Sequence, residues 1–132
     1  MEIGTDIIEI KRIKEAADRH KKFPARLLTE KELSLYNSYP AKRQATYLAG
    51  RFAAKEAYVK ALGTGIGRIT FTDIEILPDE KGKPSFTKGP IIQQAKVSIS
   101  HSHENAIAMV IIELTEPEIN EFCQVFIENK HV

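Results

Sequence analysis

Residues 50–63 read GRFAAKEAYVKALG, and this stretch decides the fold. Apart from Gly50, it consists of residues that favour a helix or fit a buried helix face, and Gly63 is the residue type that commonly ends one. The apolar helical pattern extends back to residue 41. We therefore predict a long amphipathic helix over 41–62.

The chain before this helix predicts one strand and two shorter helices. Residues 3–8, IGTDII, read as a strand, and a helix follows from about residue 9 until Pro24 ends or bends it. Thr29 and Glu32 have the spacing of a capping box, so a second helix is expected to begin there and to end before Pro40.

The chain after the long helix predicts strands and a final helix. Alternating residues over 69–77 and 84–87 predict a hairpin, and 97–102 with 106–114 predict two further strands of an antiparallel meander. Thr115 and Glu118 form a second capping-box pattern before an amphipathic stretch. We expect one α+β domain over 1–132, with 115–132 as a C-terminal helical extension.

Composition excludes several classes of protein. The 132 residues fit one domain, with 42% hydrophobic and 28% charged residues. No apolar run approaches the roughly 20 residues of a membrane span, and no signal-peptide pattern opens the sequence, so we expect a cytoplasmic protein without membrane association. Cys123, the single cysteine, excludes an intrachain disulfide and a CxxC site. A bound metal would need oxygen or imidazole ligands.

The charge is unevenly distributed. Residues 1–60 carry a net charge of +5 and residues 61–132 a net charge of −4, with much of the positive charge between Lys11 and Arg26. Such a patch suits an acidic protein, nucleic acid or a phosphorylated small molecule, and equally an ordinary solvated helix face. Nucleic acid is not expected, because the charge is local and no aromatic side chains interleave with it.

Three charged residues are candidates for a cation and phosphate site. Glu56 and Lys60 are four apart and share a helix face, either as a plain ion pair or as a metal ligand beside a phosphate-binding lysine. Asp6 interrupts an apolar strand, where it would act as a helix cap, an arginine partner or a metal ligand. Two carboxylates completed by phosphates and water suit Mg²⁺.

Two further features are weaker signals. The glycine-rich turn 63–67 lets backbone N–H groups approach a phosphate, although it lacks the P-loop pattern. His101 and His103 fall on one face of a predicted strand, but no third zinc ligand accompanies them. A phosphate-contacting or structural histidine is the favoured interpretation.

Several motifs, in order, resemble the holo-acyl-carrier-protein synthase family, the small type of 4′-phosphopantetheinyl transferase. Residues 4–10, GTDIIEI, are similar to its first signature, and residues 51–57, RFAAKEA, with Lys60 and Ala61 to its second. Shorter matches are GTGI at 63–66, GKP at 82–84 and SISHS at 98–102. The resemblance spans residues 3–114, and the helix beyond it is longer than the usual family ending.

The resemblance implies a fold and a reaction. It implies a phosphopantetheinyl transferase fold in which Asp6 and Glu56 hold Mg²⁺, with Lys60 beside them, against the diphosphate of the substrate coenzyme A. A serine hydroxyl of apo-acyl carrier protein attacks the β-phosphorus, 3′,5′-ADP leaves, and the holo-protein serves fatty acid synthesis. Glu56, directly or through a metal-bound water, is the candidate general base.

The resemblance also implies binding surfaces. The residues that match the coenzyme A cleft are Lys42, Arg51, Lys60, Gly63, Thr64, Gly65, Lys83, Pro84, Ser100 and His101. Those assigned to acyl carrier protein are Arg12, Arg19, Lys22, Phe23, Arg26 and Arg43. It further implies a homotrimer with active sites at the subunit interfaces. The alternatives are a non-catalytic module that binds acidic proteins, and an enzyme acting on another nucleotide diphosphate.

Overall fold

The computed structural model describes residues 1–130 and confirms the α+β class. Its elements are β1 (Glu2–Glu9), α1 (Ile10–Arg19), α2 (Phe23–Leu27), α3 (Glu30–Ser38), α4 (Ala41–Leu62), the 3₁₀ turn η1 (Phe71–Asp73), β2 (Glu75–Pro78), β3 (Pro84–Lys88), β4 (Ala95–His101), β5 (Asn105–Ile112) and α5 (Glu116–Lys130). The last two residues of the helix predicted over 115–132 lie outside the described residues.

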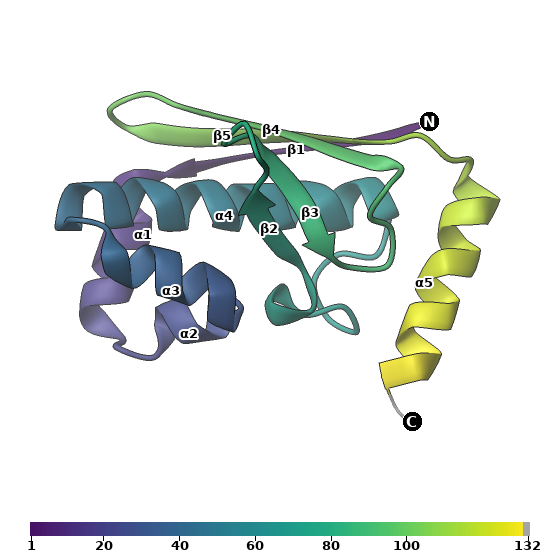
Figure 1. Ribbon diagram of the computed structural model, residues 1–132, viewed down its shortest axis with the longest axis horizontal. Coiled ribbons are helices and arrows are strands. Elements are labelled where there is room, and N and C mark those ends of the chain that lie inside the picture. The colour runs from purple at the N-terminus through teal and green to yellow at the C-terminus, as the bar shows by residue number, and fades with distance from the viewer. Residues whose placement is uncertain (131–132) are drawn as a thin grey trace.

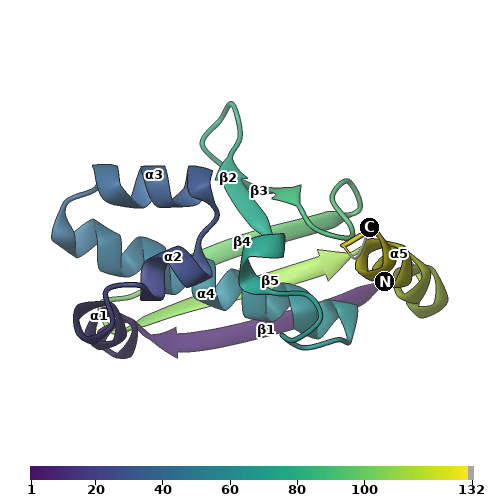
Figure 2. The ribbon, with the colours of Figure 1, turned by 90° about the horizontal axis from the view of Figure 1, so that it is seen from below.

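One helix and one sheet organise the molecule. Strands β1, β5 and β4 form an antiparallel sheet in that order, and α4 lies along one of its faces (Figure 1). Helices α1, α2 and α3 gather at one end of α4, and α5 leaves the sheet at the other end (Figures 1 and 2). Strands β2 and β3 form a separate hairpin, so the predicted antiparallel strands divide between two sheets.

Side-chain alternation separates the two faces of the three-stranded sheet. Ala106, Ala108, Val110 and Ile112 of β5 are buried toward α4, in register with the inward residues of the neighbouring strands. The opposite face keeps apolar side chains in solvent: Ile3, Ile7, Ile107 and Met109 are 41–62% exposed. We call these four residues the outer sheet face.

Gly4 sets the closeness of β1 to α4. A Cβ atom at Gly4 would lie 2.0 Å from the carbonyl oxygen of Ala57 and 2.7 Å from the amide nitrogen of Ala61. The strand backbone therefore rests directly on the helix backbone. Asp6, two residues along the same face of β1, is carried to α4 by this contact.

Two local expectations were wrong. Residues 69–74 do not form a strand, because the segment turns through η1, where the Asp73 carboxylate accepts hydrogen bonds from the amide and hydroxyl of Thr70 at 2.8 and 2.9 Å. Pro24 does not end α1, which stops at Arg19; it lies in the first turn of α2, a position that tolerates a residue without an N–H.

A buried ion pair ties α4 to α3. The Lys55 ammonium donates to Glu32 Oε1 at 2.7 Å and to the carbonyl oxygens of Leu27 and Phe71 at 2.8 and 2.9 Å, and both charged side chains are fully buried. Glu32 Oε2 accepts from the amide of Ile76 at 2.8 Å. Burial lowers the pKa of Lys55, an effect that Glu32 opposes. This pair joins four separate segments around α4.

Helix α5 packs on its own chain. Ile119 and Cys123 are 1% and 5% exposed and belong to the main core. The predicted capping box is present, since Thr115 and Glu118 exchange hydrogen bonds. None of the helices in residues 1–130 is long and apolar enough to cross a membrane.

Candidate active site

The two carboxylates predicted to share a site lie at the contact between β1 and α4. The Lys60 ammonium donates to Asp6 Oδ1 at 3.1 Å and to the carbonyl oxygen of Thr5 at 2.9 Å. The Asp6 side chain is 17% exposed, whereas that of Lys60 is 52% exposed. Glu56 is half-buried one helical turn before Lys60. Three residues from two distant motifs thus meet at one solvent-accessible edge.

The electrostatics of this site favour a cation. Burial raises the pKa of Glu56 above its ordinary value, the negative charge of Asp6 raises it further, and Lys60 lowers it. Two carboxylates that repel each other at a solvent-accessible position gain stability from a shared cation. Within residues 1–130, no group of three or more His, Cys, Asp and Glu side chains is arranged for a metal. A cation bound by these two carboxylates would take its remaining ligands from outside the pair.

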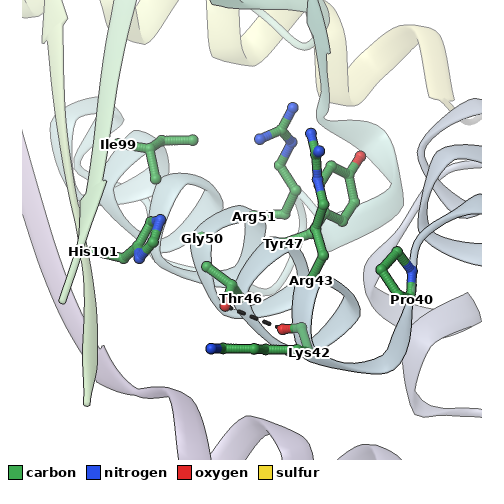
Figure 3. Close-up of a pocket in the computed structure, with 9 residues that line it drawn as sticks. All are labelled: Pro40, Lys42, Arg43, Thr46, Tyr47, Gly50, Arg51, Ile99 and His101. Atoms are coloured by element: carbon green, nitrogen blue, oxygen red, sulfur yellow. Dashed lines mark hydrogen bonds between the residues drawn. The ribbon is translucent and has the colours of Figure 1, made fainter. Parts of the chain in front are cut away.

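A basic cleft opens between α4 and β4. It has a volume of about 590 Å³ and is lined by Pro40, Lys42, Arg43, Thr46, Tyr47, Gly50, Arg51, Ile99 and His101. Ile99 and His101 reach toward α4 from the strand, and the remaining labelled residues lie on or just before the helix (Figure 3). A second hollow of about 370 Å³ continues past Lys42 and His101 to Ser102 and His103. Lys42, Arg51 and His101, three of the residues predicted for the coenzyme A cleft, line this cleft.

The cleft contains an arrangement of arginines and tyrosines that the sequence interpretation missed. The Arg43 guanidinium lies 4.2 Å from the centre of the Tyr39 ring, and Arg51 lies 4.5 Å from that of Tyr47. The two tyrosine rings meet edge to face at 5.3 Å. Burial raises the pKa of Tyr47 to about 12. Arg43, Tyr47 and Arg51 follow one another at intervals of four residues, which places them on one face of a helix. This spacing is the sequence signal that could have predicted the arrangement.

The glycine loop, residues 63–67, starts where α4 ends. Gly63 adopts a left-handed φ of 80° and Gly65 a φ of 65°. The amides of Thr64 and Gly65 donate to the carbonyl oxygen of Val59 at 3.1 and 3.3 Å, which fixes the beginning of the loop. All five residues are exposed, one turn beyond Lys60.

The other predicted coenzyme A residues lie apart from the basic cleft. Lys83 is exposed in the β2–β3 turn, where its amide donates to Asp79 Oδ1 at 2.9 Å, and Pro84 begins β3. Ser100 is exposed on the side of β4 opposite to His101. Neither Lys83 nor Ser100 lines the cleft that holds Lys42 and Arg51.

The residues predicted for the carrier protein divide between two surfaces. Arg12 and Arg19 are exposed on α1, and Lys22, Phe23 and Arg26 lie at or in α2. Arg43 instead lines the basic cleft beside Tyr39. The basic patch of the sequence is therefore concentrated on the α1–α2 end of the molecule.

The carboxylate pair and the basic cleft lie on different sides of α4. Glu56 and Arg51 are five residues apart, so they point about 140° apart around the helix axis. Asp6 and Ile99 are in register across β5, on opposite edge strands of the sheet and about 10 Å apart by strand spacing. The two groups of predicted site residues therefore lie on different sides of α4 in the single chain.

Comparison with known proteins identifies the family. Residues 2–112 match the family model described as the 4′-phosphopantetheinyl transferase superfamily. The chain belongs to this superfamily. Its phosphopantetheinyl transferase relatives include the holo-[acyl-carrier-protein] synthase of Geobacillus kaustophilus, 53% identical over 116 residues that cover 87% of this chain and 90% of the relative. That of Streptococcus uberis is 47% identical, covering 83% and 93% of the two chains.

Solved phosphopantetheinyl transferases share the fold. The holo-(acyl-carrier-protein) synthase of Bacillus anthracis, in complex with CoA (3′,5′-ADP), matches with a TM-score of 0.78 and 44% identity, covering 86% of this chain and 96% of that one. The Helicobacter pylori synthase in complex with coenzyme A matches with a TM-score of 0.74 and 37% identity, covering 84% and 99%. The predicted family and its phosphopantetheinyl transferase fold are confirmed, and with them the transferase class of the enzyme.

Proposed function

We propose that this chain transfers the 4′-phosphopantetheine group of coenzyme A to a serine of apo-acyl carrier protein, releasing 3′,5′-ADP. The observation that carries this proposal is the meeting of Asp6, Glu56 and Lys60 at one accessible edge, in a chain whose solved relatives bind coenzyme A. Fatty acid synthesis is the process that the product would serve, and the cytoplasm is the proposed location.

Asp6 and Glu56 are the proposed ligands of Mg²⁺. Their donor set fits this ion, because two carboxylate oxygens leave room for phosphate oxygens and water around a hard cation that is seldom fully enclosed by protein. When bound, Mg²⁺ would offset the negative charge of the diphosphate. Glu56, directly or through a metal-bound water, is also the proposed base for the serine hydroxyl.

Lys60 is the proposed contact to the transferring phosphate. Its ammonium is half-exposed, and in the structure it neutralises Asp6 at 3.1 Å. A flexible lysine with a solvent-accessible ammonium can turn to a substrate oxygen without opening the core. Positioning and electrostatic stabilisation of this kind account for most catalysis of phosphoryl-type transfer.

The basic cleft is the proposed site for the 3′-phosphate end of coenzyme A. Lys42, Arg43, Arg51 and His101 bring cations or hydrogen-bond donors to one hollow. The Tyr47 hydroxyl is buried and has no hydrogen-bond partner among the described residues, so it adds a donor that a ligand would satisfy. The glycine loop and the turn with Lys83 and Pro84 remain the proposed contacts to the rest of the substrate, and Ser100 a proposed contact from the outer side of the sheet.

A homotrimer is the proposed assembly. The outer sheet face, Ile3, Ile7, Ile107 and Met109, is apolar and exposed in the single chain, as expected of a surface that a partner covers. The carboxylate pair and the basic cleft face different sides of α4. A ring of subunits would pair the carboxylates of one chain with the cleft of its neighbour.

The α1–α2 surface is the proposed docking site for acyl carrier protein. Arg12, Arg19, Lys22 and Arg26 present positive charge, and Phe23 adds an apolar contact between them. Arg43, at the edge of the cleft, is a proposed contact for a carrier protein that reaches toward the bound substrate. Salt should slow this association, because exposed charges steer it.

A mass measurement tests the transfer directly. Apo-acyl carrier protein incubated with this protein, coenzyme A and Mg²⁺ should gain the mass of phosphopantetheine. A carrier protein whose acceptor serine is changed to alanine should gain nothing. No gain under conditions where a known synthase modifies the same carrier protein would refute the proposed activity.

A further inference from the structure

Helix α5 lies beyond the part of the chain that the family model matches, which ends at residue 112. The helix is nevertheless built into the domain, because Ile119 and Cys123 are buried in the main core and Phe126 and Ile127 pack against it. The same core contains Leu62 and Ile69, the residues that flank the glycine loop. The extension therefore shares one hydrophobic core with the residues on either side of that loop.

The last turn of α5 holds the segment that follows the glycine loop. The Lys130 ammonium donates to the carbonyl oxygen of Arg68 and to Asp73 Oδ2, each at 2.6 Å. The side chains of Lys130 and Asp73 are 28% and 19% exposed, so the ion pair is partly shielded from water. Because Asp73 Oδ2 also accepts both hydrogen bonds of Thr70, one carboxylate connects α5 to η1.

The glycine loop is thus fixed at both ends and exposed in between. At its beginning, the amides of Thr64 and Gly65 donate to the last turns of α4. Beyond its end, Ile69 is buried and the carbonyl oxygen of Arg68 accepts from Lys130. Three glycines in five residues give the intervening backbone a large conformational freedom to lose on binding a ligand. The Lys130 contact after the loop restricts this freedom before a ligand binds, so less conformational entropy is lost on binding.

We propose that Lys130 is a positioning residue for the glycine loop, and that α5 acts as a brace that favours binding of coenzyme A. This inference rests on the proposed role of the loop in contacting coenzyme A. The brace acts on substrate affinity and not on the chemical step, because Asp6, Glu56 and Lys60 are positioned by β1 and α4, whose contact does not involve α5.

Single substitutions in the last turn of α5 distinguish the loss of the Lys130 contacts from other effects of changing this helix. Lys130→Met removes the ammonium but keeps a long side chain, and Lys130→Arg restores a charged donor. Asn129→Met, at an exposed neighbouring position, is the matched control. We expect Lys130→Met to raise the KM for coenzyme A about three- to tenfold with kcat nearly unchanged, the range expected for a partly exposed charged hydrogen bond. Lys130→Arg and Asn129→Met should stay close to the wild type.

Hydrogen exchange tests the brace without any activity. Amides of residues 63–70 should exchange faster in Lys130→Met than in the wild type and in Asn129→Met, because local opening becomes easier. Unchanged exchange with unchanged KM would overturn the brace. Faster exchange with unchanged KM, or a fall in kcat alone, would overturn its link to coenzyme A. If the wild type transfers nothing, the proposed function fails, whereas the exchange comparison still decides whether Lys130 holds the loop.

Discussion

Gly4 and Ala57 touch backbone to backbone, and this contact positions the carboxylates of Asp6 and Glu56 together. A Cβ atom at residue 4 would lie 2.0 Å from the Ala57 carbonyl oxygen, a position that no relaxed structure allows. Because backbone atoms of both elements take part, the clash cannot be relieved by turning a side chain. Either β1 must move away from α4 or the strand must distort.

We therefore expect Gly4→Ala to impair both stability and transfer. Overpacking of this kind costs about 1–3 kcal/mol of the free energy of unfolding. Displacement of Asp6 from Glu56 should lower kcat/KM beyond what the lost stability explains. Denaturant unfolding and transfer assays at a temperature where the variant is folded measure the two effects. Ser34→Ala, at an exposed position of α3 outside the proposed site, is the control. Full activity of Gly4→Ala would contradict the assigned role of the contact.

Metal binding can be measured apart from catalysis. Mg²⁺ at about one hundred times its dissociation constant should stabilise the folded wild type by about 2.7 kcal/mol, through mass action. Asp6→Asn and Glu56→Gln should lose this gain, because a neutral amide is a poor ligand for a hard cation. Thermal melting with and without Mg²⁺ gives the comparison, with the exposed Glu113→Gln as a control. If Mg²⁺ stabilised the wild type and the three variants equally, the ion would not be bound by Asp6 and Glu56.

The raised pKa of Glu56 predicts how stability depends on pH in metal-free protein. The folded state holds this proton more tightly than the unfolded state, so the resulting stabilisation is present below the ordinary value of 4.5 and is lost as pH rises through the higher folded pKa. The side chain of Glu56→Gln does not ionise. The free energy of unfolding of this variant should equal that of the wild type at low pH and exceed it at neutral pH. Urea unfolding across this pH range measures the difference between the two proteins. A variant less stable than the wild type at neutral pH would reverse the predicted sign.

Subunit mixing tests the proposed trimer. Asp6→Asn removes a carboxylate, and Lys42→Glu reverses an exposed charge in the basic cleft, so each variant alone should be nearly inactive. If each site joins the carboxylates of one chain to the cleft of the next, co-expressed equal amounts should regain about one quarter of wild-type activity. Size measurements should show trimers in every sample. Recovery near zero in verified mixed trimers would place a complete site within one chain.

Removal of one partner from the buried ion pair should destabilise the whole fold. Lys55→Met leaves Glu32 without its ammonium partner, and the expected cost is about 3–5 kcal/mol of the free energy of unfolding. The partly exposed Lys130→Met should cost far less. Denaturant unfolding of both variants and of the wild type shows whether Lys55→Met loses more stability than Lys130→Met. A smaller loss for Lys55→Met would mean that water or rearrangement replaces the pair.

The sequence could predict the elements and the family but not every partner. Helical periodicity predicted α4, and ordered motifs predicted that Asp6 and Glu56 belong to one site. The helix containing Lys55 gives no local indication that this lysine points inward to Glu32, because that pairing depends on how α3 is placed against α4. Residues 69–74 alternate like a strand, yet a side-chain hydrogen bond from Thr70 to Asp73 turns them instead. The packing of α5 on the core likewise depended on its tertiary partners.

Cys123 gives the docked α5 an internal chemical reporter. It is the only thiol in the 132 residues, it is 5% exposed, and burial raises its pKa, so the reactive thiolate is scarce while the helix is in place. Alkylation should therefore proceed only through molecules in which α5 has come away from the core. The labelling rate of the unmodified protein then measures how often the extension detaches, with no engineered probe.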